Sequence, residues 1–161
     1  MPPSAIVDKI NLAPWFFIAG VVGMAAAVSA SGLGDLVGRE LFALVKLEPG
    51  QDALNFAAVS AMGMVIGLIT TVPGEPAIMS ALADEIAVST GWPLYTVLMA
   101  QVISWTMAPF PYALPPLVIA AQLAGARASH LLSLLLAMTA LAWIVMLPLQ
   151  YLWWRMLDMF A

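Results

Sequence analysis

The residue best placed to do chemistry in this sequence is Glu75, because it stands in a break between two apolar stretches. The segment 70–76 reads Thr-Thr-Val-Pro-Gly-Glu-Pro, and its prolines and glycine end one helix before another begins. If this break lies at membrane depth, its ionisable side chain is a candidate for holding a proton or completing a sodium site. If the flanking stretches are two ordinary spans, Glu75 is an exposed loop acid. The sequence leaves both interpretations open.

A second break lies at residues 108–116, between the apolar and charge-free stretches 94–107 and 117–125. Each of its prolines lacks a backbone donor, and the residue before each proline is moved out of helical geometry. Bare backbone inside a bilayer is tolerated only where protein buries it or a water-filled cavity meets it. Many secondary transporters build their substrate and ion sites from discontinuous helices of this kind. The two breaks therefore predict one shared site.

Such a site needs few special side chains, since helix ends supply ligands. A half-helix N-terminus favours an anion, so we expect amides after positions 77 and 117 to face one. Unwound carbonyls favour a cation, and those at 70–71 and 107–108 are candidates. Tyr112 either donates a hydrogen bond to the substrate or packs with its hydroxyl satisfied internally. The predicted substrate and ion site comprises Thr70, Thr71, Gly74, Glu75, Ala108, Pro111, Tyr112, Ala113 and Pro115, with Thr71 and Glu75 nearest the ion if it is Na⁺.

Composition places these breaks in a membrane protein. Of the 161 residues 63% are hydrophobic and 9% are charged, whereas about a quarter of a soluble domain is charged. The net charge of −4 leaves no basic footprint for nucleic acid. One histidine and no cysteine argue against a zinc site, and no nucleophile–base set or His-Glu-x-x-His pattern indicates an enzyme. We expect no cofactor beyond a coupling ion, Na⁺ or H⁺.

The predicted fold is one all-α integral membrane domain over residues 1–161, with the other elements arranged around the breaks. The expected elements are a transmembrane span at 12–30, an interfacial helix at 34–48, a re-entrant helical hairpin at 52–89, a proline-broken discontinuous helix at 94–125 and a last span at 131–154.

Each of these assignments follows from local pattern. Residues 34–48 mix charged and apolar side chains over a length too short to span, which indicates a helix in the interface plane; a folded surface loop is the alternative. The hairpin is expected to re-enter because its short return arm contains Asp84 and Glu85, which are costly to insert. Its outgoing arm contains the small-xxx-small pattern 63–67, which permits close helix approach or is ordinary packing. Pro148 predicts a kink in the last span.

This order of elements resembles one inverted repeat, the C-terminal half, of the divalent anion/sodium symporter family in the ion transporter superfamily. Two sequence echoes support the resemblance: Ser-Ala-Ser-Gly-Leu at 29–33, and Pro-Tyr-Ala-Leu-Pro-Pro at 111–116. The resemblance covers nearly the whole chain. It implies that the hairpin and the broken helix bind substrate and coupling ion together.

The chain departs from the family pattern at the hairpin tip and after the second break. The family's tip has Ser-Asn-Thr, whereas residues 71–73 read Thr-Val-Pro and retain one hydroxyl. Leu117 stands where an asparagine often follows the Pro-Pro pair, and Leu114 stands at the threonine position before it. The resemblance therefore implies anion transport without specifying a dicarboxylate.

The sequence thus predicts a secondary active transporter, or half of one, that moves a small anion or weak acid with Na⁺ or H⁺. The alternative is a non-transporting membrane subunit that uses the same half-fold for assembly. Expected partners are the lipid bilayer, the anionic solute, and a complementary N-terminal half or further copies of the chain. We expect a multi-pass protein of a bacterial-type inner (plasma) membrane.

Overall fold

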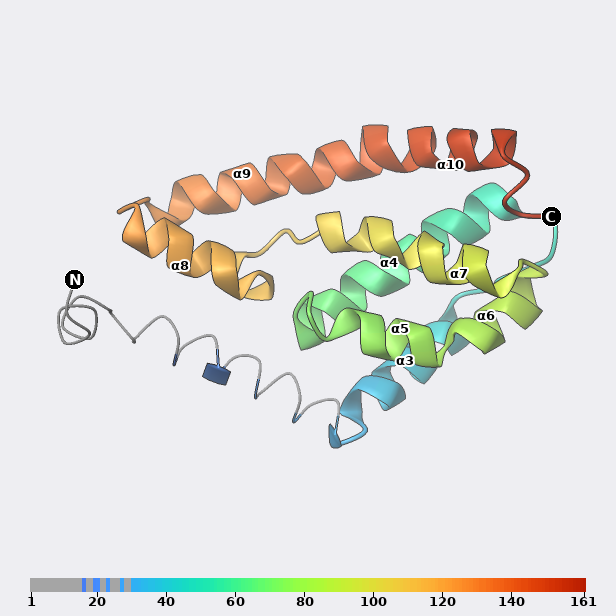
Figure 1. The fold of residues 1–161 in the computed structure, drawn as a ribbon, viewed down its shortest axis with the longest axis horizontal. Coiled ribbons are helices and arrows are strands. Elements are labelled where there is room, and N and C mark those ends of the chain that lie inside the picture. The colour runs from blue at the N-terminus through green and yellow to red at the C-terminus, as the bar shows by residue number, and fades with distance from the viewer. Residues whose placement is uncertain (1–15, 17–18, 21–22, 24–26, 28–29) are drawn as a thin grey trace, which may run out of the picture.

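The structure, a computed structural model, describes residues 16, 19, 20, 23, 27 and 30–161. Most of the predicted span at 12–30 therefore lies outside the described residues. Within the described part, every regular element is helical (Figure 1). The elements are α3 Leu33–Leu44, α4 Asp52–Thr70, α5 Glu75–Ala81, α6 Ala83–Thr90, α7 Leu94–Ala100, the 3₁₀ segments η1 Gln101–Thr106 and η2 Pro111–Ala113, α8 Pro115–Leu123, α9 Ala128–Leu141, the π segment η3 Ala142–Met146, and α10 Leu147–Met156.

Two of the described helices are long and apolar enough to cross a membrane. They are α4, with 19 residues, and the continuous helix Ala128–Met156, with 29 residues, formed by α9, η3 and α10. A third crossing is possible by length and composition if α6 and the α7–η1 helix, Leu94–Thr106, count as one span bent by 113°. The chain thus has the helices of a membrane protein.

Helix α4 is the central element, packing against η1, α3, α5 and α10. Its buried apolar side chains recur every three or four residues, as the core face of a helix requires. They meet apolar side chains from α5, α6, α7 and η1 in one core cluster. The central members of this cluster are Phe56, Val59, Met62, Ile66, Ile78, Ile86, Val97 and Ile103, each at most 3% exposed.

The predicted hairpin has a matching shape in the structure. Its long arm, α4, ends at Thr70, the turn 71–74 reverses the chain, and α5 and α6 return along the other side (Figure 1). Helix α3 crosses this return arm at Gly38, where an added Cβ would lie 2.9 Å from the Cδ1 atom of Leu82. Re-entry into a bilayer and an interfacial position of α3 remain predictions.

Helix α3 ends at Leu44, four residues before the predicted boundary at 48. Proline at position 49 disfavours helical geometry at Glu48. The side chain of Asn55 also binds the main chain there, since Glu48 N donates to Asn55 Oδ1 (3.2 Å) and Asn55 Nδ2 donates to Glu48 O (2.8 Å). The segment between α3 and α4 is therefore held against the start of α4 and does not continue α3.

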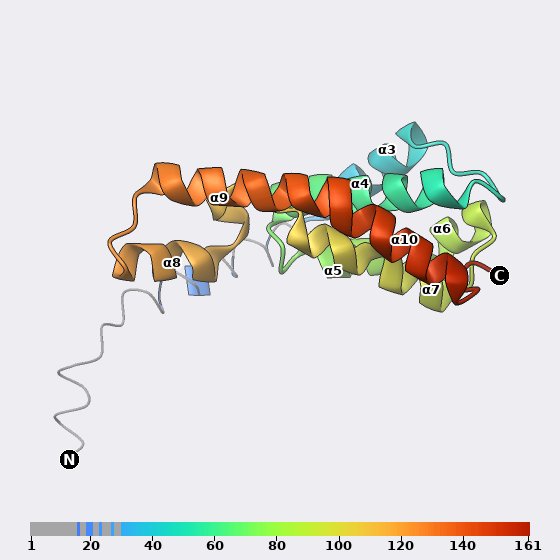
Figure 2. The same ribbon diagram turned by 90° about the horizontal axis from the view of Figure 1, so that it is seen from above.

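The predicted discontinuous helix is broken where the prolines stand. The α7–η1 helix ends at Thr106, and α8 begins at Pro115. Helix α8 thus starts two residues before the expected position 117, because proline is well tolerated in the first turn of a helix. In the two views, α8 continues away from α6 to the far end of the molecule, where the chain turns and α9 runs back beside α8 (Figures 1 and 2).

The last helix runs through Pro148 without a break, from Ala128 to Met156. Its backbone widens into a π segment at η3, immediately before the turn that contains the proline. A proline removes one N–H and crowds the carbonyl four residues earlier, and a local π turn is a common way to absorb that conflict. The structure thus has a π turn just upstream of Pro148, and the kink at Pro148 stays a prediction.

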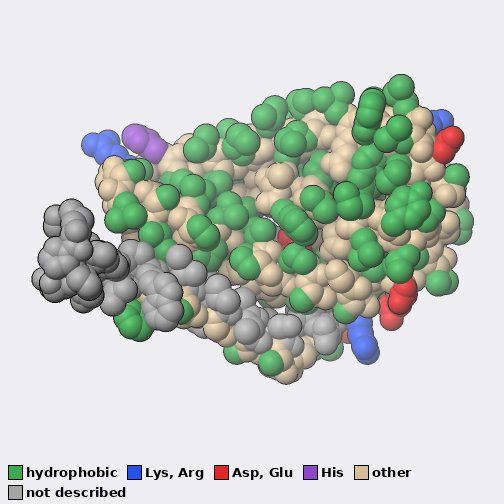
Figure 3. All heavy atoms as spheres, in the orientation of Figure 1, with side chains coloured by type: hydrophobic (Ala, Val, Ile, Leu, Met, Phe, Trp, Pro, Cys, Tyr) green, Lys and Arg blue, Asp and Glu red, His purple; other side chains and the backbone are tan. Residues whose placement is uncertain are grey.

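Charged side chains lie mainly toward the two ends of the long axis. Figure 3 shows hydrophobic side chains over most of the face between those ends. Arg127 and His130 lie at the start of α9, whereas Arg155 and Asp158 lie at the end of α10, and all four are exposed. This distribution matches an apolar band between two polar surfaces.

Candidate ion and substrate site

Glu75 is fully buried although it begins a helix next to a turn. Its side chain is 0% exposed. Glu75 Oε1 is hydrogen-bonded to the hydroxyl of Ser104 on η1, while Glu75 Oε2 is buried without a hydrogen-bond partner. A buried carboxylate is costly unless it is paired and hydrogen-bonded. Glu75 is therefore not the exposed loop acid of the alternative interpretation.

Two glycines of α4 make room for this carboxyl group. Gly63 and Gly67 are four residues apart, which places them on one face of the helix. An added Cβ at Gly63 would lie 2.6 Å from Glu75 Oε1 and 2.7 Å from Ser104 Cβ. An added Cβ at Gly67 would lie 2.9 Å from Glu75 Oε2. The two glycines of this small-xxx-small pattern thus leave space on α4 for the Glu75 carboxyl group and the Ser104 side chain.

Ser104 belongs to the candidate site through its bond to Glu75, and the sequence did not predict it. The hydroxyl of Ser104 also reaches the main-chain carbonyl of Gln101, three residues earlier. In a 3₁₀ segment, residues three apart lie on the same side, so both side chains of η1 are buried next to α4. Gln101 Oε1 is buried without a hydrogen-bond partner. The sequence pattern that could have indicated this pair is two polar residues, Gln101 and Ser104, three positions apart in an apolar stretch.

The hairpin turn and the second break meet, as predicted. The main-chain N–H of Val72 donates to the carbonyl of Ala113 at 3.0 Å. The hydroxyl of Tyr112 donates to the carbonyl of Leu68, in the last turn of α4, at 2.8 Å. Tyr112 therefore has the internally satisfied hydroxyl of the second sequence interpretation. Together these two bonds, which we call the tip–break link, join segments far apart in the chain.

Thr71 occupies the turn in a conformation unusual for threonine. Its φ is 70° and its ψ is 157°, a region populated almost only by glycine that costs about 1–3 kcal/mol for other residues. Its Oγ1 is buried without a hydrogen-bond partner. The neighbouring Thr70 differs, since its Oγ1 donates to the carbonyl of Ile66 at 2.9 Å. Of the two threonines, only Thr71 has a hydroxyl oxygen left for a ligand.

The remaining predicted site residues shape the backbone. Gly74 N donates to Thr71 O at 3.0 Å, and an added Cβ at Gly74 would lie 2.9 Å from the carbonyl oxygen of Thr70. Ala108 is buried in the break, while Pro111 begins η2 and the buried Pro115 begins α8. The structure therefore has two parts to the predicted site: the tip–break link, and the Glu75 carboxyl group between α4 and η1.

Comparison with known proteins does not define the chemistry of this site. The chain matches no protein-family model, no curated protein and no solved structure. The resemblance seen in the sequence stays a prediction.

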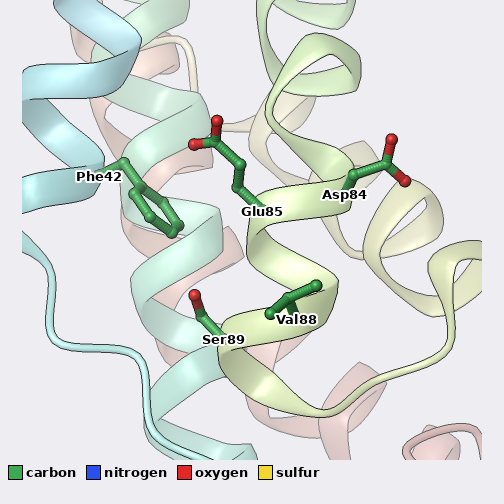
Figure 4. A pocket seen from close by; sticks show the side chains of 5 residues that line it. All are labelled: Phe42, Asp84, Glu85, Val88 and Ser89. Atoms are coloured by element: carbon green, nitrogen blue, oxygen red, sulfur yellow. The ribbon is translucent and has the colours of Figure 1, made fainter.

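A separate hollow of about 400 Å³ opens between α3 and α6. It is lined by Phe42 of α3 and by Asp84, Glu85, Val88 and Ser89 of α6 (Figure 4). Figure 4 shows the Glu85 side chain extending from α6 toward the α3 side, opposite Phe42. Both acids are exposed. Among the described residues, no group of three or more His, Cys, Asp or Glu side chains is arranged to hold a metal ion.

Proposed function

We propose that this chain is a half-unit or C-terminal part of a secondary active transporter, and that it moves a small anion or weak acid together with Na⁺ or H⁺. The observation that supports this function best is the tip–break link. It joins a helical hairpin turn to a proline-rich helix break through Val72 N–Ala113 O and Tyr112 Oη–Leu68 O bonds. Paired breaks of this kind are how discontinuous helices form transport sites.

The anion would bind at the helix starts that face the two breaks. The N-terminal turns of α5 and α8 follow the hairpin turn and the second break, respectively. Pro76, Pro115 and Pro116 have no N–H. The amides of Leu117 and Val118 already donate to the carbonyl of Leu114, at 2.9 and 3.3 Å. The start of α8 would therefore act through its positive helix-end charge, and the start of α5 through the amides after Pro76. The unpartnered hydroxyl oxygen of Thr71 adds a side-chain ligand at the turn.

In this proposal, α4 to α6 form a re-entrant hairpin, α3 lies in the interface plane and the chain is multi-pass in a bacterial-type plasma membrane. Large apolar side chains support lipid contact along α9 and α10. Exposed examples are Leu134, Leu136, Met138, Leu141, Ile144, Leu149 and Leu152, each at least 46% exposed. A complementary half, or a second copy of the chain, would complete the transporter.

Flux through proteoliposomes tests the proposal. The purified chain would be reconstituted alone and with any co-purifying membrane partner, and uptake of labelled inorganic anions and carboxylates would be measured under Na⁺ and pH gradients. We expect uptake that depends on one of the two gradients. Thr71→Val should reduce it at least severalfold, because the hydroxyl is lost while the β-branched shape remains, whereas Thr139→Val in α9 should not. Absence of flux for every solute and partner would leave the assembly-subunit function instead.

A further inference from the structure

We infer that Glu75 is held as a neutral carboxylic acid bonded to Ser104, and that it is the proton-binding group of this transporter. The inference rests on the proposed transport function. It goes further in selecting H⁺ over Na⁺ as the coupling ion. Three features of the described residues support it, namely the hydrogen-bond count at Ser104, the charges around Glu75, and the space beside its carboxyl group.

The first feature is that Ser104 has one hydroxyl proton but two acceptors in reach. Its Oγ contacts both Glu75 Oε1 and the main-chain carbonyl of Gln101. If Glu75 is ionised, the serine can donate to only one of these oxygens at a time. If Glu75 is protonated, its O–H donates to Ser104 Oγ, and the serine O–H donates to Gln101 O. Only the acid form satisfies both contacts.

The second feature is the absence of a cationic partner among the described residues. The α4 face against Glu75 presents Gly63 and Gly67, and η1 presents Ser104 and Gln101, none of which titrates. Tyr112 in the break has its hydroxyl bonded to Leu68 O. The charged or titratable side chains described on α3 and α6, the helices packed on α5 to either side, are all exposed: Arg39, Glu40, Asp84 and Glu85.

Every other described basic side chain is exposed as well. These are Lys46, Arg127, His130 and Arg155. With no positive charge beside it, the ionised form of a buried carboxyl group loses its hydration without compensation. The neutral acid avoids most of that cost.

The third feature is the tight fit of the carboxyl group against α4. A methyl group at Gly63 would lie 2.6 Å from Oε1, and one at Gly67 would lie 2.9 Å from Oε2. The α4 side of the carboxyl group therefore has no space for an ion. Binding H⁺ needs no such space, because it converts the carboxylate to a carboxylic acid through one new O–H bond. Release restores the carboxylate, and nothing is oxidised or reduced.

Infrared spectroscopy of the protein in lipid tests the protonation state directly. We expect the wild type at neutral pH to show the C=O stretching band of a protonated carboxylic acid, and Glu75→Gln to remove it. Ser104→Ala should shift this band, because the acid loses its hydrogen-bond acceptor. Glu85→Gln and Ser80→Ala are matched controls at exposed positions, and they should leave the band unchanged. A wild type without a Glu75-dependent band would overturn the inference, whatever the flux.

Proton movement during uptake tests the coupling role. A pH-sensitive dye should report H⁺ entering wild-type proteoliposomes with the labelled solute, at a ratio that Glu75→Gln lowers at least tenfold relative to Glu85→Gln. Solute flux driven by Na⁺ alone, or unchanged proton movement in Glu75→Gln, would overturn the inference while leaving the proposed function intact. Absence of solute flux in the wild type would instead reject the proposed function, and the coupling role with it. Circular dichroism of each variant confirms that it is folded.

Discussion

At the scale of single residues, Thr71 combines backbone strain with an unused hydroxyl. Its φ of 70° and ψ of 157° suit glycine better than a β-branched residue. A strained residue persists only when the surrounding structure fixes it, and such residues concentrate at functional sites. Thr71 is therefore a position where stability and function should respond to substitution in opposite directions.

Replacing Thr71 by Gly should stabilise the protein by about 1 kcal/mol, because relief of strain exceeds the entropy that glycine loses on folding. Thermal unfolding in detergent would measure the change, and the uptake assay should show reduced transport in the same variant. Thr70→Gly is the matched control: it lies in the last turn of α4 and loses a bond to Ile66 O, so it should destabilise. Similar destabilisation by both substitutions would contradict the strain argument.

Adding a methyl group at the two glycines that face Glu75 should destabilise the protein in a graded way. Gly63→Ala overlaps both Glu75 Oε1 and Ser104 Cβ, and it should cost about 1–3 kcal/mol. Gly67→Ala meets the Glu75 carboxyl group alone and should cost less. Gly20 has nothing within 4 Å of an added Cβ, so Gly20→Ala should be neutral or slightly stabilising. Chemical denaturation would rank the three, and an equal effect of all three would refute the overlap.

Individual residues differ in how well the sequence predicts their place in the structure. Glu75 was identifiable because an acid between prolines in an apolar chain is conspicuous. Ser104 was not, because serine is common in membrane helices and its direction depends on the 3₁₀ geometry of η1. Leu44 stands three residues after Leu41, a spacing that predicts one helical face, yet Leu44 is 78% exposed. The helix ends there, so its apolar periodicity no longer determines burial.

At the scale of elements, the breaks were more predictable than what they contact. Prolines act locally, so the sequence placed the second break between 107 and 117, and the structure has no α-helix from Met107 to Leu114. The tip–break link joins positions 41 and 44 residues apart, Val72 with Ala113 and Leu68 with Tyr112. The sequence supplied a reason for the two breaks to meet, but no local pattern specifies which atoms bond.

Removing the Tyr112 hydroxyl should loosen the contact between the two breaks. Tyr112→Phe deletes the bond to Leu68 O, which should cost about 0.5–1.5 kcal/mol. Hydrogen exchange should also increase at the amide of Val72, since the partner bond of the link becomes easier to open. Tyr95→Phe is a matched control, because Tyr95 is 51% exposed and Tyr112 is 54% exposed. Equal exchange in the two variants would mean that the hydroxyl does not hold the breaks together.

Over the whole molecule, the helix Ala128–Met156 is the longer of the two described helices that could cross a membrane. Its 29 residues extend for about 43 Å at about 1.5 Å per residue, which exceeds the roughly 30 Å of a bilayer core. Exposed charged residues stand at both ends, and exposed leucines lie between them. This pattern fits a helix that is long enough to cross the bilayer with some tilt.

Cysteine labelling can test whether this helix crosses, since the chain has no native cysteine. Single cysteines at Ala126 and Met156 should react with a membrane-impermeant maleimide from opposite sides of sealed vesicles. A cysteine at Leu136, which is 47% exposed, should stay unlabelled because lipid covers it. Labelling of Ala126 and Met156 from the same side would contradict a single crossing by this helix.

The tip–break link also restricts how the protein can move. One of its bonds is purely main chain, from Val72 N to Ala113 O, so no side-chain rotation releases it. In the proposed transporter, alternating access would either move the turn and the break together or open this bond in every cycle. Candidate pivots for such a movement are Gly91 and Gly125, which lie at the two ends of the broken helix with φ values of 76° and 63°. The broken helix would then change its backbone conformation at these two glycines, while the bond between the turn and the break stayed intact.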